Sequence, residues 1–136
     1  YYVQKAMNLL KKIQTDSEIH DQWGNGDATQ VHHIFPKSQF PELAHYLENM
    51  IKLTATQHYT KAHPKNNTQQ INRDYQLTCL LAKADTIEAS LGAVGDKYYR
   101  KESFVCVINI GLNTEFNVGI TFADIKRKLI KVYNYV

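Results

Sequence analysis

Apolar residues recur at helical spacing over much of the chain. Near the N-terminus, Ala6 and Leu10 lie four residues apart, as on the buried face of an amphipathic helix. The run 103–110 is rich in β-branched residues, but Ser103 at its start and Gly111 behind it favour a helix over a strand. The same apolar period and the capping signals predict helices over residues 2–14, 42–47, 55–62, 68–91 and 121–135.

Two short segments have the composition of β-strands. Residues 30–35 are rich in strand formers and stop at Pro36, and residues 50–54 form a second short apolar run. The order helix, strand, loop, strand, helix and further helices predicts an α+β chain with little sheet. Its 136 residues are enough for one domain with one core, so we expect 1–136 to be a single domain. Because the chain does not begin with Met, we also expect it to be part of a longer protein.

Composition narrows the classes of partner. A net charge of +3 and a pI near 8.8 permit a polyanionic partner without requiring one. Cys79 and Cys106 lie in apolar surroundings and form no paired motif, so neither a Cys-ligated zinc nor an oxidising compartment is expected. No apolar run is long enough to cross a bilayer, so we expect a cytoplasmic protein without a membrane partner.

Two neighbouring histidines on the first predicted strand are candidates for chemistry. Adjacent strand residues point to opposite faces, so His32 and His33 cannot both bind one metal ion from a regular strand. They can instead have separate roles, with one ring facing a cation and the other facing a substrate phosphate. A neutral imidazole, with a pKa near ~6.5, suits a general base if a partner fixes its tautomer.

The region around these histidines has an ordered set of motifs. Residues 31–36 (VHHIFP) contain a His-His pair followed by a proline three positions after the second histidine. Asn49 is followed by apolar residues one and four positions later. His58 lies nine residues after Asn49. Residues 29–66 therefore resemble the HNH endonucleases, also called ββα-metal or His-Me finger nucleases, and especially the restriction-type members. The resemblance implies a ββα-metal core, a short two-stranded hairpin plus a helix. Together with the helices predicted from the apolar pattern, this core would be embedded in a mostly helical domain with a helical extension over 68–135.

The resemblance also implies an activity and a role for each residue. The chain would be an endonuclease that hydrolyses DNA phosphodiester bonds, with one divalent metal ion held by His32 and His58. His33 would be the general base, and the side-chain oxygen of Asn49 would accept the Nδ1–H of His33. Mg²⁺ or Mn²⁺ is expected first, with Zn²⁺ or Ni²⁺ as alternatives because imidazole ligands are softer than carboxylates.

The place of His63 is left open by its spacing. It follows His58 by five residues, which on a continuous α-helix turns the two side chains about 140° apart. Pro64 ends the helix, however, so His63 can still turn back toward the cation. A third metal ligand and a phosphate contact both stay open for His63.

Basic residues near the motif are candidates for contacts with DNA. Lys37, Lys61 and Lys65 can bind the phosphate backbone, and such contacts position a duplex without reading its sequence. Two cuts across a duplex need two active sites, so a homodimer is expected in the working enzyme. The expected role is the cleavage domain of a restriction or other defence enzyme.

Two other functions are compatible with the same residues. One is the non-specific nuclease domain of a bacteriocin-type toxin. The other is a non-catalytic, zinc-stabilised DNA-binding module in which His32, His58 and His63 hold a structural ion. His33 and Asn49 argue against the second alternative, since a structural site needs neither a base nor a residue that orients it.

Overall fold

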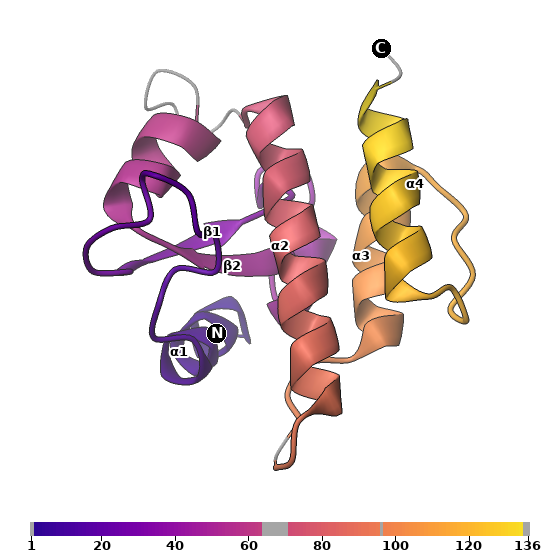
Figure 1. Cartoon of the computed structure of the whole chain (residues 1–136), viewed down its shortest axis with the longest axis horizontal. Helices are drawn as coiled ribbons and strands as arrows, with labels where there is room; N and C mark the ends of the chain where they lie inside the picture. The colour runs from indigo at the N-terminus through magenta and orange to yellow at the C-terminus, as the bar shows by residue number, and fades with distance from the viewer. Residues whose placement is uncertain (1, 64–70, 96, 135–136) are drawn as a thin grey trace.

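The computed structural model describes residues 2–63, 71–95 and 97–134 (Figure 1). In chain order the elements are α1 (Tyr2–Ile13), β1 (Gln30–His33), the 3₁₀ turns η1 (Pro41–Leu43) and η2 (Leu47–Asn49), β2 (Met50–Leu53), the π-helical segment η3 (Gln57–Ala62), α2 (Arg73–Gly92), α3 (Lys101–Leu112) and α4 (Phe122–Asn134). The predicted α+β class is confirmed, since helices surround one small sheet.

The sheet is an antiparallel hairpin of β1 and β2, with Gln30 opposite Leu53 and His33 opposite Met50. The helix α1 packs on this hairpin, while α2 contacts η3 and runs alongside α4 (Figure 1). The hairpin therefore lies directly against the N-terminal helix.

Several predicted boundaries change for local reasons. The first strand ends at His33 rather than at 35, because the side chain of Asn49 takes both backbone hydrogen bonds of Phe35. The single helix predicted over 42–47 is replaced by η1 and η2. The long helix begins at Arg73, where the Asn72 side chain accepts the N–H of Tyr75 as an N-cap. The part of that prediction over 68–70 lies outside the described residues.

The ambiguous run 103–110 is a helix, as favoured, but Gly111 does not end it. The helix α3 continues to Leu112 and ends on Asn113, which adopts the left-handed conformation. A Cβ on Gly111 would lie 2.5 Å from the ring of Phe35. The glycine therefore lets α3 approach the end of the first strand closely.

A buried ion pair crosses the core. The Lys83 ammonium of α2 lies 3.0 Å from Glu18 Oε1 and 2.9 Å from the Tyr99 hydroxyl, and its side chain is fully buried. Glu18 Oε2 also accepts the backbone N–H of Lys52 in β2 at 2.8 Å. The pair thus connects the segment after α1, the strand β2, the helix α2 and the segment before α3.

Removing one member of this pair should destabilise the protein strongly. In Lys83→Met the Glu18 carboxylate stays buried without its cation, so we expect a loss of about 3–5 kcal/mol in the free energy of unfolding, measured with urea. Adding Glu18→Gln should restore part of that loss, because the uncompensated charge is then gone.

Lys126→Met is the matched control. Lys126 pairs with Asp85 at 2.7 Å on the surface, and such pairs contribute about 1 kcal/mol or less. Equal losses of stability in Lys83→Met and Lys126→Met would contradict the importance of the buried pair. So would a Lys83→Met, Glu18→Gln double variant whose loss equals the sum of the two single losses.

Candidate metal centre

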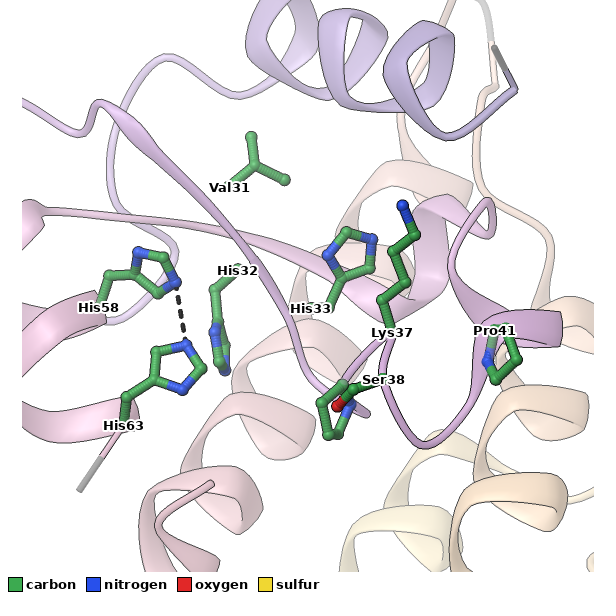
Figure 2. A pocket seen from close by; sticks show the side chains of 9 residues that line it. Val31, His32, His33, Lys37, Ser38, Pro41, His58 and His63 are labelled. Carbon is green, nitrogen blue, oxygen red and sulfur yellow. Dashed lines mark hydrogen bonds between the residues drawn. The ribbon is translucent and has the colours of Figure 1, made fainter. Parts of the chain in front are cut away.

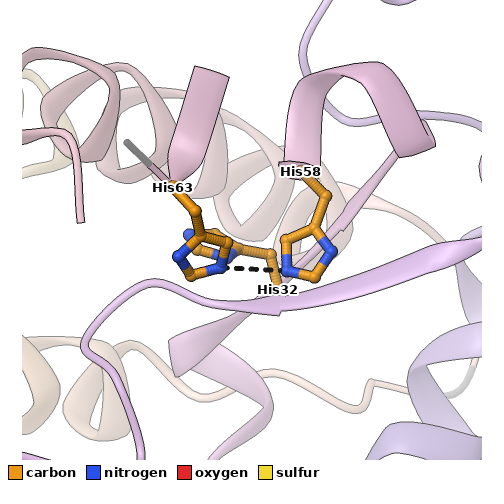
Figure 3. A group of neighbouring side chains, drawn as sticks. All are labelled: His32, His58 and His63. Atoms are coloured by element: carbon orange, nitrogen blue, oxygen red, sulfur yellow. Dashed lines mark hydrogen bonds between the residues drawn. The ribbon is translucent and has the colours of Figure 1, made fainter. Parts of the chain in front are cut away.

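Three imidazoles converge between the hairpin and the segment that follows it (Figure 3). His32 comes from β1, His58 from η3, and His63 directly follows η3. The ring centroids are 4.8 to 5.1 Å apart, and one nitrogen from each ring lies within 4.8 Å of the others. These three histidines could hold a metal ion, and we call them the histidine triad.

The π-helical turn explains how His63 joins the triad. In an α-helix the five-residue spacing from His58 would turn the side chains about 140° apart. A π-helix instead pairs residues five apart, so the chain returns to nearly the same face after five residues. As a result, His58 Nε2 and His63 Nε2 lie 3.1 Å apart. Of the two roles left open for His63, this position favours the metal ligand.

His32 is buried in an unusual way. It is 1% exposed, and neither of its ring nitrogens has a hydrogen-bond partner among the residues that the structure describes. Buried polar atoms normally have a partner, so two such nitrogens on one ring need an explanation. A metal ion bound by the triad would satisfy one of them. Tetrahedral zinc with Zn–N bonds of about 2.0–2.1 Å also places its nitrogens about 3.3 Å apart, close to the His58–His63 separation.

The surroundings of His32 and His58 favour their neutral rings. Burial is the main cause that lowers the pKa of His32 well below its ordinary value, and the neighbouring His58 and His63 lower it further. Burial, followed by His63 and His33, lowers the pKa of His58 to about 4. Metal binding requires neutral imidazole, so these two candidate ligands are in the protonation state that could bind an ion at neutral pH.

A cavity of about 470 Å³ opens beside the triad, and His33 lines it too (Figure 2). His33 Nε2 lies 2.8 Å from the carbonyl oxygen of Ala44, and since a carbonyl only accepts, Nε2 carries the proton. The other ring nitrogen, Nδ1, is then the basic one. Burial lowers the pKa of His33, as does the Lys37 ammonium to a smaller extent, while the Ala44 carbonyl raises it.

The predicted hydrogen bond between Asn49 and His33 is wrong. Asn49 is fully buried, and its side chain accepts the N–H of Phe35 and donates to the carbonyls of Phe35 and Leu43. The residue that orients His33 is instead Ala44, through its backbone. Asn49 fixes the chain on either side of this contact, since Phe35 follows His33 by two residues and Leu43 precedes Ala44.

The three predicted phosphate contacts differ in their surroundings. Lys37 lines the cavity together with Ser38. Lys61 lies with its ammonium 3.7 Å from the centre of the Trp23 ring, a cation–π contact on the neighbouring loop. Lys65 lies outside the described residues. Of the two lysines that the structure describes, Lys37 is the one that lines the cavity with the histidines.

Sequence reasoning missed Gln30 and the Ala44 carbonyl. Gln30 Oε1 lies 3.2 Å from His58 Nδ1. Its position two residues before His32 is a usable signal, because alternate strand residues share a face. The Ala44 carbonyl gives no signal in the sequence, since it is a backbone group placed by η1.

Comparisons with family models, with curated proteins and with solved structures find no match for this chain. Among the described residues, no helix combines the length and the apolar character needed to cross a membrane. The functional argument therefore depends on the site itself.

Without metal, the triad should make the fold sensitive to acid. Unfolded histidines titrate near ~6.5, whereas the folded pKa values of His32 and His58 are lower. Below about pH 6.5 the unfolded chain binds protons at these positions before the folded chain does, so stability present above that pH is lost on acidification toward pH 4. We expect urea midpoints of chelator-treated protein to fall over this range. The fall should be shallower in a His32→Asn, His58→Asn double variant, and equal slopes would contradict the argument.

A divalent ion should stabilise the folded chain through the triad. With free Zn²⁺ at about 100 times its Kd, linkage adds about 2.7 kcal/mol to the free energy of unfolding. Thermal unfolding with and without Zn²⁺ measures this gain, which His58→Ala or His63→Ala should remove. His45→Ala is the control, because His45 is exposed and stacks on Tyr46. A gain that survives loss of either ligand would remove that ligand from the set.

Proposed function

We propose that this chain is a metal-dependent endonuclease of the HNH (ββα-metal) type that hydrolyses DNA phosphodiester bonds. The observation that carries the proposal is that the histidine triad and His33 line one cavity. The strand β1 supplies His32 and His33, and the segment η3 with the residue that follows it supplies His58 and His63.

The donor set favours particular ions. Three imidazoles, with no carboxylate beside them among the described residues, suit Zn²⁺ or Ni²⁺ better than Mg²⁺, which prefers oxygen ligands. We therefore propose Zn²⁺ or Ni²⁺ ahead of the Mg²⁺ or Mn²⁺ expected first from the sequence. Such an ion, held by His32, His58 and His63, would supply Lewis-acid stabilisation of charge on the phosphate.

His33 is proposed as the general base. Its Nε2–H is held by the Ala44 carbonyl, so Nδ1 has the free lone pair that can take a proton from water. Because its pKa is lowered, the ring is neutral at neutral pH, as a base must be. Asn49 acts through the backbone as a positioning residue: it holds Leu43, next to the carbonyl that orients His33.

Lys37 is proposed as the cation that receives the substrate. It lines the cavity from the turn after β1, on the side of His33 (Figure 2). An ammonium there attracts a phosphate without reading the bases. Lys61 remains a proposed DNA contact, although it would have to leave the face of Trp23 to reach a phosphate.

The non-catalytic zinc module is the weaker alternative. Structural zinc sites are almost always closed by four protein ligands, whereas catalytic sites have three and an open position. The described residues supply three ligands beside an open cavity that also contains an oriented base. This arrangement supports catalysis over a purely structural role.

The proposed biological role is cleavage of DNA in restriction or another defence process, with the working enzyme a homodimer. A bacteriocin-type toxin would have the same centre but no sequence preference. The products distinguish the two, because restriction gives discrete bands from a plasmid and a non-specific toxin gives a smear.

Plasmid cleavage tests the activity and the base together. Wild-type protein supplied with Zn²⁺, Ni²⁺, Mn²⁺ or Mg²⁺ should cut DNA, and His33→Ala should slow the single-turnover rate by about 10²- to 10⁴-fold, the usual contribution of a general base. Zinc binding should be unchanged, because His33 is not a ligand of the triad.

His45→Ala is the matched control for this experiment, since it makes the same substitution on an exposed ring. It should cut at the wild-type rate. Wild-type protein that cuts DNA with none of these ions would overturn the proposed activity, and equal rates for wild type and His33→Ala would overturn the role of His33.

A further inference from the structure

We propose that Gln30 is a positioning residue of the metal centre, whose side-chain carbonyl holds His58 in the tautomer with its Nε2 lone pair toward His32 and His63. The inference rests on the proposed metal centre and adds a residue to it. Gln30 lies outside the triad and outside the cavity lining, so it would act through His58 alone.

The hairpin explains why Gln30 can reach His58. Gln30 and His32 are two residues apart on β1, so both side chains point to the same face of the sheet. The segment η3 lies over that face and brings His58 Nδ1 to 3.2 Å from Gln30 Oε1. One strand face therefore supplies both a ligand and a partner for a second ligand.

The amide of Gln30 has a defined orientation. Its Nε2 donates to the hydroxyl oxygen of Thr29 at 3.2 Å, which leaves Oε1 turned toward His58. A carboxamide oxygen only accepts, so the hydrogen of this contact belongs to His58 Nδ1. Gln30 thus fixes which ring nitrogen carries the proton.

This choice of tautomer matters for the triad. A neutral imidazole has one N–H, so a proton on His58 Nδ1 leaves the lone pair on Nε2. That Nε2 is the nitrogen that lies 3.1 Å from His63 Nε2 (Figure 3). The opposite tautomer would point a hydrogen into the triad and would have to rearrange before binding an ion.

Substitutions of Gln30 should change the Zn²⁺ affinity by amounts that depend on whether an acceptor oxygen is kept. Residues that accept the second N–H of a metal-bound histidine fix its orientation and raise its basicity, and their loss typically weakens metal binding about 10- to 100-fold. Gln30→Leu should therefore weaken Zn²⁺ binding by about this factor. Gln30→Glu keeps an acceptor oxygen and adds negative charge, so it should bind Zn²⁺ at least as tightly as wild type.

Competition with a chromophoric zinc chelator measures these affinities on the whole chain. Gln14→Leu is the matched control: it also replaces a half-buried glutamine, one that donates to the Tyr99 hydroxyl at 3.1 Å. It should leave Zn²⁺ affinity unchanged. Equal Zn²⁺ affinities for Gln30→Leu and wild type would overturn the positioning role while leaving the metal centre in place.

A second readout does not depend on metal. Long-range ¹H–¹⁵N spectra of the metal-free protein report histidine tautomers, and His58 should be Nδ1-protonated in wild type but a mixture in Gln30→Leu, with unchanged spectra of His20 and His45. An Nε2-protonated His58 in wild type would overturn the proposal. If wild-type protein bound no Zn²⁺, the proposed metal centre would fail, and these spectra would still decide whether Gln30 sets the tautomer.

Discussion

The burial of Lys83 against Glu18 is the constraint on which the rest of the structure depends. A fully buried ammonium is tolerated only with an anion and further acceptors around it, and here Glu18 and the Tyr99 hydroxyl meet that need. Glu18 in turn binds both backbone groups of Lys52. The backbone N–H of Glu18 donates to the Lys52 carbonyl, and the Glu18 carboxylate accepts the Lys52 N–H. The strand β2 is thereby tied to α2, and the hairpin cannot shift without exposing or separating the pair.

A fixed hairpin keeps neighbouring side chains of β1 on opposite faces of the sheet. One face presents Gln30 and His32 to the π-helical segment, and the other presents His33 to the carbonyl of Ala44. A register slip of one residue would exchange the two faces, so the proposed ligand and the proposed base would trade places. The strict pairing of His32 with Ile51 and of His33 with Met50 keeps the two roles separate.

Sequence reasoning recovered the parts of this arrangement that depend on local patterns. The two strands and the opposite faces of His32 and His33 follow from residue types and periods, whereas the meeting of His32 with His58 was implied by the resemblance to HNH nucleases. The π-helical form of η3 was not predicted, because the spacing of apolar residues does not distinguish backbone hydrogen bonds between residues five apart from those between residues four apart. For that reason the contact of His63 with His58 was left open. The Asn49–His33 hydrogen bond was predicted wrongly, because the side chain meets backbone groups of Phe35 and Leu43 whose positions depend on the 3₁₀ turns.

The buried polar network was also missed, although part of it had a signal. Lys83 lies three residues after Leu80 and four before Ile87, on the same buried stripe of α2. A lysine at such a position requires a buried acceptor. Its partner Glu18 lies in an irregular segment far away in the sequence, and no period points to it. Tertiary structure was needed to identify the partner, while the need for one could have been read from the helix.

The π-turn that completes the triad is held from outside the triad. Gln57 is the first residue of η3 and is fully buried. Its side-chain oxygen accepts hydrogen bonds from Ser17 and Thr54. Its side-chain nitrogen donates to the Ile19 carbonyl and to the Asp21 carboxylate. Asp21 also accepts the hydroxyl of Tyr75 in α2. These bonds fix the start of η3 against the segment that contains Glu18, so the buried ion pair and the histidine triad share one support. Binding of a metal ion by the triad would then require little ordering of the chain, because the three histidines are already positioned by groups outside the triad.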